Sequence, residues 1–171
     1  MEFRLTTCTV RSCEWRDRES IVRHANNRNV WLNLRDRFPH PYTDADARNF
    51  LDMVVGVTPV TSFAIALDDE AVGGIGFTVQ NDVAHRSAEI GYWLGEQFWG
   101  RGIATEALTA VTEYAFRNFD LCRLYAHVFE WNPASARVLE KAGYQFEGRL
   151  KKSVTKDGRT IDQLIYAIVR D

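Results

Sequence analysis

Two glycines separated by one arginine form the segment whose residue types point most directly to ligand binding. Gly100 and Gly102 flank Arg101, and a segment with helical periodicity follows them. Glycine permits tight backbone turns, and the amide N–H groups of such a turn and of a helix N-terminus can bind an anion together. The segment can therefore bind a phosphate, begin a helix, or do both.

Two common phosphate-binding loops do not match this segment. A Walker loop needs a lysine directly after its last glycine, and no lysine precedes Lys141. A dinucleotide fingerprint needs a third small residue at position 105, where Thr105 stands, and an acidic residue at the end of the next parallel strand. Asp120 is near the required distance but precedes that predicted strand. Nucleotide hydrolysis and NAD binding are therefore disfavoured.

Polar residues next to predicted strands and helices are candidates for proton transfer. Glu89 shares a strand face with Gly91 and Trp93, and its residue type suits either a base or a solvent-facing side chain. Asn132 precedes Pro133 at a predicted helix start, and Ser135 falls in the first turn of that helix. These two residues suit a purely structural role as well as contact with a ligand.

Alternating strands and helices must position these residues. The hydrophobic pattern predicts an α+β fold in which a helix-rich N-terminal part is followed by a strand meander, a strand-helix-strand-helix segment and a hairpin. The expected strands cover residues 3–11, 62–80 (a hairpin), 83–94, 121–129 and a final hairpin that turns at Asp157-Gly158. The expected helices cover 16–25, part of 29–38, 44–55 after a Thr43 cap, 103–115 with a buried stripe at Ala104, Ala107, Leu108, Val111 and Ala115, and 133–142.

Length and composition favour one domain over residues 1–171. The chain is 46% hydrophobic, has a net charge of −2 and contains three cysteines. No apolar run approaches the ~18 residues of a membrane span, and the start lacks a signal-peptide layout, so we expect a cytoplasmic protein without membrane contact. The four histidines show no metal spacing, so no metal is expected, and the charge balance favours no direct nucleic-acid binding. Cys122 is expected in the core beside Leu124 and Val128.

Gln97-x-x-Gly100-x-Gly102 resembles the Gln/Arg-x-x-Gly-x-Gly/Ala motif of the GNAT N-acetyltransferase superfamily, in the same place between a strand and a helix. The flanking segments AEIGYWLGEQFWGRGIATEA and WNPASARVLEKAGYQFEG are similar to the branch with the ribosomal-protein N-terminal (alanine) acetyltransferases. The resemblance is strong over residues 83–168 and looser before them. It implies a GNAT fold with a mixed, mostly antiparallel sheet of about seven strands flanked by helices.

The resemblance also implies where acetyl-CoA binds. Strands 83–94 and 121–129 should splay apart at the centre of the sheet and admit the cofactor. Pantetheine should pair with the backbone of the first strand near its end and with Asn132, and the pyrophosphate should meet the glycine loop. The implied contacts are Trp93, Leu94, Gly95, Gln97, Trp99, Gly100, Arg101, Gly102, Ile103, Ala104 and Thr105.

For catalysis, the resemblance implies a base or acceptor-site carboxylate at Glu89 and places Ser135 near the sulfur. The general acid is left open between Ser135, Tyr144 and a water molecule. Tyr42 is a weaker candidate for contact with the acceptor, in an aromatic region with Trp31, Phe38 and His40.

The implied activity is transfer of acetyl from acetyl-CoA to a primary amine, directly within a ternary complex and without a metal. The N-terminal amine of a ribosomal protein is one expected acceptor. A small amine such as a polyamine, amino acid or antibiotic remains an alternative, with Asp44, Asp46, Asp52 and the Asp68-Asp69-Glu70 turn as acidic candidates. A CoA-binding sensor without catalysis and a homodimeric state also remain open.

Overall fold

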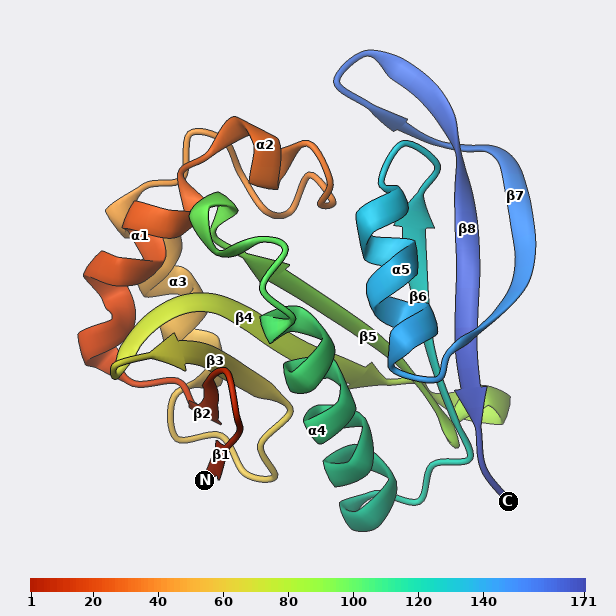
Figure 1. Cartoon of the computed structure of the whole chain (residues 1–171), viewed down its shortest axis with the longest axis horizontal. Helices are drawn as coiled ribbons and strands as arrows, with labels where there is room; N and C mark the ends of the chain where they lie inside the picture. The colour runs from red at the N-terminus through yellow and green to blue at the C-terminus, as the bar shows by residue number, and fades with distance from the viewer.

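A single eight-stranded sheet with helices on both faces organises the chain in the computed structural model, which describes residues 1–171 (Figure 1). The fold class is α+β, as predicted. The helices are α1 (Arg18–Ala25), α2 (Arg28–Trp31), α3 (Asp44–Val54), α4 (Ile103–Asn118) and α5 (Pro133–Lys141). The strands are β1 (Glu2–Arg4), β2 (Thr9–Ser12), β3 (Ser62–Leu67), β4 (Glu70–Val79), β5 (Ser87–Leu94), β6 (Arg123–Phe129), β7 (Gln145–Lys156) and β8 (Arg159–Val169).

The strands lie in the order β1-β2-β3-β4-β5-β6-β8-β7, and only the β5–β6 pair is parallel. The eighth strand arises because residues 3–11, expected as one strand, fold back on themselves. Leu5 N–H donates to Cys8 O at 2.9 Å, which closes a turn between β1 and β2. The sheet is therefore one strand wider than expected but has the expected mixed, mostly antiparallel pattern.

The two central strands separate soon after they meet, as expected. Pairing between β5 and β6 is confined to Ser87–Glu89 against Arg123–Tyr125. Beyond these residues β5 stays paired with β4 up to Leu94, and β6 stays paired with β8 up to Phe129. Each strand therefore leaves one backbone edge unpaired on the side that faces the other strand.

Most helices begin and end where their capping residues predict. Thr43 Oγ1 accepts the Asp46 N–H at 3.3 Å at the start of α3, and Asn132 Oδ1 accepts the Ser135 N–H at 3.3 Å at the start of α5. The final hairpin turns at Asp157-Gly158, as expected. Local capping chemistry is thus sufficient to define these boundaries.

Two expected elements are shorter than the sequence pattern indicated. The helical spacing of Trp31, Leu34 and Phe38 yields only one turn, α2. Arg35–Arg37 are exposed, and Phe38 packs against Tyr42 and Trp93 from a non-helical segment. The strand expected from residue 83 begins at Ser87, because Asp82 has a positive φ of 53° and opens a 3₁₀ turn over Asp82–Ala84.

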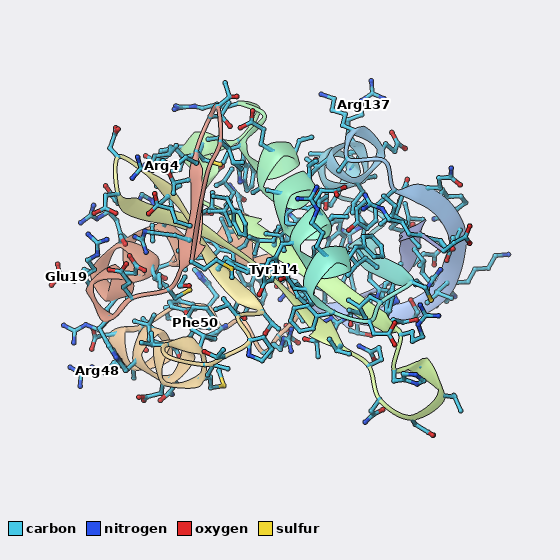
Figure 2. The ribbon with its side chains drawn as sticks, turned by 90° about the horizontal axis from the view of Figure 1, so that it is seen from below. Arg4, Glu19, Arg48, Phe50, Tyr114 and Arg137 are labelled. Carbon is cyan, nitrogen blue, oxygen red and sulfur yellow. The ribbon has the colours of Figure 1, made fainter.

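Two hydrophobic clusters lie on opposite faces of the sheet. Figure 2 shows Arg137 of α5 on one side and Arg48 and Phe50 of α3 on the other. The larger cluster packs α4 and α5 on the sheet, and the smaller one packs α1 and α3 on the other face. The expected stripe on α4 is buried at Ala107, Leu108, Val111 and Ala115, but Ala104 is only half-buried and Thr112, expected outside the stripe, is buried.

Cys122 is not a core residue, contrary to expectation. It precedes the first residue of β6, so the alternation that buries Leu124, Ala126 and Val128 does not extend to it. Its side chain is partly exposed, and its Sγ lies 3.6 Å from Arg86 O.

None of the helices is long and apolar enough to cross a membrane. No group of three or more histidine, cysteine or acidic side chains is arranged to hold a metal ion.

Candidate active site

A cleft of about 1210 Å³ opens where β5 and β6 separate. Most of its wall comes from β3 to β6, helices α3 and α5, the first turn of α4, and the segment between α2 and α3. The cleft therefore joins the predicted phosphate loop to the predicted catalytic residues.

The glycine loop presents backbone N–H groups at one end of this cleft. Gly100 and Gly102 have φ values of 75° and 79°, and a Cβ at either residue would meet no atom within 4 Å. The glycines are thus needed for the left-handed backbone and not for close packing. The Glu106 N–H bonds Gly102 O at 3.1 Å, so the N–H groups of Ile103–Thr105 precede the first intrahelical bond of the sixteen-residue helix α4. Such a helix start attracts anions.

Two side chains fix the shape of the loop. The Trp99 indole N–H donates to Leu94 O at 2.8 Å and so ties the loop to the end of β5. The guanidinium of Arg101 lies 5.5 Å from the Phe98 ring centroid. Both residues line the cleft, which leaves the Arg101 charge available beside the helix start.

Two of the predicted cofactor contacts lie outside the cleft lining. Gly95 donates its N–H to Val72 O at 2.8 Å, and a Cβ there would lie 3.2 Å from Val72 O, His24 and Phe98. Gln97 is exposed in the 3₁₀ turn Glu96–Phe98. The other predicted contacts do line it: Trp93, Leu94, Trp99, Gly100, Arg101, Gly102, Ile103, Ala104, Thr105 and Asn132.

Glu89 lines the middle of the cleft and is not a freely solvated surface residue. Its side chain is 23% exposed, forms an ion pair with Arg35, and has His127 Nδ1 at 3.0 Å from Oε1. The hydrogen bond from His127 and the charge of Arg35 hold the pKa of the Glu89 carboxyl below its usual value. The carboxylate is therefore ionised at neutral pH, and its Oε1 takes both contacts.

A pair of hydroxyl groups lies on the α5 side of the cleft. Tyr92 OH is 2.9 Å from Ser135 Oγ and 3.2 Å from Ser135 O, and both residues line the cleft. Burial raises the pKa of Tyr92 to about 12, so this phenol keeps its proton at neutral pH. Ser135 thus has a proton donor as its neighbour, which the sequence did not indicate.

Tyr144, the third residue weighed as an acid, lies in the core. It is 3% exposed, its OH is 2.7 Å from Thr112 Oγ1, and it is not part of the cleft lining. Burial raises its pKa above the usual value. The structure separates it from the other predicted catalytic residues.

The aromatic N-terminal region contributes part of the opposite wall. Tyr42 and Phe38 line the cleft with ring centroids 5.0 Å apart, whereas Trp31 and His40 do not line it. Of the acidic residues considered for a polyamine, only Asp46 reaches the cleft. Asp44 forms ion pairs with Arg18 and Arg48. At the β3–β4 turn, Asp69 pairs with Arg16 and Glu70 pairs with Arg23.

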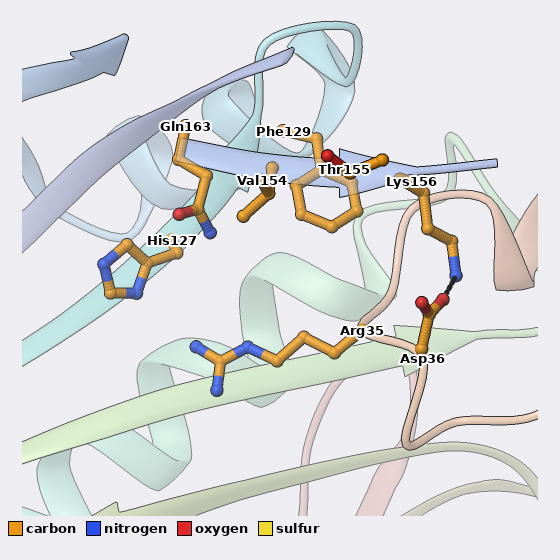
Figure 3. Close-up of a pocket in the computed structure, with 8 residues that line it drawn as sticks. All are labelled: Arg35, Asp36, His127, Phe129, Val154, Thr155, Lys156 and Gln163. Carbon is orange, nitrogen blue, oxygen red and sulfur yellow. Dashed lines mark hydrogen bonds and ion pairs between the residues drawn. The ribbon is translucent and has the colours of Figure 1, made fainter. Parts of the chain in front are cut away.

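A smaller pocket of about 320 Å³ adjoins the cleft beyond Glu89 and shares four residues with it: Arg35, His127, Phe129 and Gln163. Figure 3 shows Arg35, His127 and Gln163 at one end of this pocket and the Lys156–Asp36 ion pair at the other. Lys156 is buried, and its Nζ lies 2.8 Å from Asp36 Oδ1 and 3.7 Å from the Trp31 ring centroid.

Arg35, Tyr92 and His127 line the cleft but were not among the predicted site residues. The alternation on β6 places His127 opposite the buried face of Leu124, Ala126 and Val128, so its direction was predictable. Its partner was not, because Glu89 and His127 meet only through the order of strands in the sheet.

The chain is similar in sequence to several proteins that are named acetyltransferases. The chain is 29% identical over 170 residues, 95% of its own length and 92% of the other, to "Uncharacterized N-acetyltransferase p20" of Bacillus licheniformis. It is 33% identical to the ribosomal-protein-serine acetyltransferase of Escherichia coli over 64% of this chain and 60% of that one. It is 26% identical to the spermidine N(1)-acetyltransferase of Vibrio cholerae over 90% and 88% of the two chains.

The fold has close counterparts among solved structures. A ribosomal L7/L12 α-N-protein acetyltransferase in complex with coenzyme A superposes with a TM-score of 0.85 at 22% identity, over 99% of this chain and 98% of that one. The family model described as "Acetyltransferase (GNAT) domain" matches residues 8–145, which include β2 to α5 and the whole glycine loop. The chain therefore belongs to the GNAT acetyltransferase family.

Proposed function

We propose that this acetyltransferase transfers the acetyl group of acetyl-CoA directly to the α-amine of a protein N-terminus, within a ternary complex. The observation that supports this acceptor most is the state of the carboxylates along the cleft and its adjoining pocket. Three acidic residues line them, and each is already bound within the protein: Asp36 to Lys156, Asp46 to Thr43, and Glu89 to Arg35 and His127.

Acetyl-CoA fits the end of the cleft formed by the glycine loop. We place its pyrophosphate on the N–H groups of residues 99–104 with Arg101 beside it, and the pantetheine along the unpaired edge of β5 at Trp93 and Leu94. Gly95 is left out of this contact because its N–H is already bonded to Val72 O. Asn132 uses Oδ1 for its cap, so its amide NH₂ is free to donate to pantetheine.

The thioester then lies between the hydroxyl pair and Glu89. Ser135, with Tyr92 as its neighbour, is on the side where the thiolate leaves, and a hydroxyl donor there stabilises the developing charge. Glu89 marks the side from which the amine approaches and loses its proton. In this proposal, Ser135 and Tyr92 supply the acid and stabilise the developing charge, and Glu89 supplies the carboxylate on the acceptor side. No covalent intermediate on the enzyme is needed.

An α-amine suits this acceptor side better than a polyamine does. An α-amine has a pKa of roughly 8 and is partly neutral at neutral pH, so it carries little charge that the protein must balance. A polyamine carries several ammonium groups, and each would need a carboxylate that is free to pair with it. The similarity to the ribosomal-protein-serine acetyltransferase supports the same acceptor class.

A small amine is the second candidate, because one relative aligned over most of both chains acetylates spermidine. The two acceptor classes separate in a screen that measures CoA thiol release with peptides of varied N-terminal residue, spermidine, amino acids and aminoglycosides. We expect acetyl-CoA to bind with a micromolar Kd in calorimetry and the peptides to give the highest kcat/KM. Binding without turnover of any amine would favour a CoA sensor, and absence of binding would refute the proposal.

A further inference from the structure

We infer that His127 Nε2, and not the Glu89 carboxylate, accepts the proton of the acceptor amine, and that Glu89 is the residue that positions His127. This inference rests on the proposed function and deepens it. His127 is in β6, lines both the main cleft and the adjoining pocket, and has a side chain that is 22% exposed. It therefore lies where the acceptor side of the cleft continues into the smaller pocket.

The contact with Glu89 fixes which imidazole nitrogen is free. Nδ1 lies 3.0 Å from Glu89 Oε1, and an ionised carboxylate can only accept a hydrogen bond, so Nδ1 carries the proton. Nε2 then carries the lone pair of the neutral ring, and no protein group hydrogen-bonds to it. A carboxylate that holds one nitrogen protonated and leaves the other as a base is the arrangement that orients catalytic histidines in serine hydrolases.

Glu89 itself is a poor proton acceptor here. Its carboxylate is bound to His127 and to Arg35, and its pKa is held below the usual value by those contacts. Both contacts fall on Oε1, and protonating the carboxylate would weaken them because they favour its charged form. A base with a depressed pKa removes protons weakly. The same carboxylate stabilises a positive imidazolium, so it assists the histidine that it cannot replace.

The surroundings of the imidazole contain one negative group in contact with it. The Tyr125 ring packs edge-on with centroids 5.7 Å apart, and Gln163 lies at the same end of the small pocket. Of the charged groups nearby, Arg35 is paired with Glu89, Lys156 is paired with Asp36, and Arg37 lines the main cleft. Glu89 is therefore the one contacting counter-charge for a proton taken up by the ring, and the imidazolium shares it with Arg35.

The chemical step balances with water as the only other participant. The nitrogen lone pair of the neutral amine attacks the thioester carbonyl carbon, the N–C bond forms, and the C–S bond breaks with its electron pair left on sulfur. One proton moves from the nitrogen to His127 Nε2, which passes it to water in the open cleft. The thiolate takes a proton from the Ser135–Tyr92 hydroxyl pair, which recovers one from water.

The substitution His127→Gln tests the inference, with the exposed His85→Gln as the matched control. We expect H127Q to lower kcat/KM by about 100-fold, the scale of a lost general base, with an acetyl-CoA Kd within about twofold of the wild type. Added imidazole should restore part of the rate in H127Q and have no effect on H85Q. The double variant E89Q/H127Q should be no slower than H127Q, because the two residues act as a unit.

A measurement without turnover checks the same contact. The ¹⁵N NMR spectrum of the His127 ring should show Nδ1 protonated and Nε2 unprotonated in the wild type, and E89Q should change this tautomer balance. An H127Q rate within about threefold of the wild type, together with a large loss in E89Q, would overturn the inference and assign the base to Glu89. A wild-type protein that binds no acetyl-CoA, or that acetylates no peptide α-amine, would instead refute the proposed function, so the two failures are distinguishable.

Discussion

At the residue scale, we propose that the hydroxyl pair formed by Tyr92 and Ser135 serves the thiolate side of the cleft. A serine hydroxyl alone is a weak proton donor, but Tyr92 OH can donate to Ser135 Oγ and orient the serine proton toward the sulfur. Because burial raises the pKa of Tyr92 to about 12, this donor is intact over the whole neutral range. The pair explains why a serine can serve where a single stronger acid is absent.

Removing either hydroxyl should slow the release of CoA. We expect S135A and Y92F each to lower kcat by about tenfold to 100-fold, because the departing thiolate loses a stabilising donor. The KM for acetyl-CoA should stay within about threefold of the wild type. Steady-state kinetics by thiol release measures both constants, with Tyr144→Phe as a control in the core. A Y144F effect larger than that of S135A would return the acid role to Tyr144.

At the element scale, the turn that begins α4 depends on a left-handed glycine. Gly102 has φ 79° and sits at the N-cap of α4, so alanine there is strained even though no neighbouring atom obstructs its Cβ. Gly158 in the β7–β8 turn has φ 72° and the same open surroundings, but lies outside the cleft lining. A comparison of substitutions at Gly102 and Gly158 therefore distinguishes the effect of backbone strain from the effect of lost ligand contact.

Alanine at these two glycines should give equal strain and unequal binding. We expect G102A and G158A each to lower the free energy of unfolding by about 1 kcal/mol. Only G102A should weaken acetyl-CoA binding, by about tenfold, because its strained turn misdirects the N–H groups of residues 99–104. Denaturant unfolding and calorimetry measure the two effects. Equal acetyl-CoA affinity in both variants would contradict the role of this loop.

Elements with their own capping signals were predictable from the sequence. The Thr43 and Asn132 caps, the Asp157-Gly158 turn and the loop before α4 all lie where local residue chemistry placed them. The prediction of a helix through Phe38 was wrong because helical spacing alone does not sustain a helix in so short a segment. The prediction that Cys122 is buried was wrong because alternation predicts burial only within the strand, and β6 begins one residue later.

At the scale of the whole molecule, the site is assembled from segments far apart in the chain. Glu89 on β5 meets Arg35 from the segment after α2 and His127 from β6, across 54 and 38 residues. The family resemblance indicated Glu89, the glycine loop and Ser135 separately, but only the strand order brings Glu89 and His127 together. The partners of Glu89, and hence its low pKa, could not be predicted from the sequence.

The splayed sheet also determines how donor and acceptor reach each other. The glycine loop lies at the end of the cleft beyond β5, and the small pocket adjoins the cleft beyond Glu89, so the two substrates can occupy it together. Direct transfer is the proposed route, because such an arrangement can hold both reactants in one complex. We expect an acceptor that carries little excess positive charge, because Asp36 and Glu89 are already paired with basic residues.

Mass spectrometry of one peptide tests this account most directly. The peptide carries a free α-amine at an N-terminal serine and a lysine ε-amine further along, and is incubated with the protein and acetyl-CoA in competition with spermidine. The account predicts a single acetyl group on the serine α-amine, with little acetylated spermidine. Acetylation of spermidine or of the lysine in preference to the α-amine would contradict it.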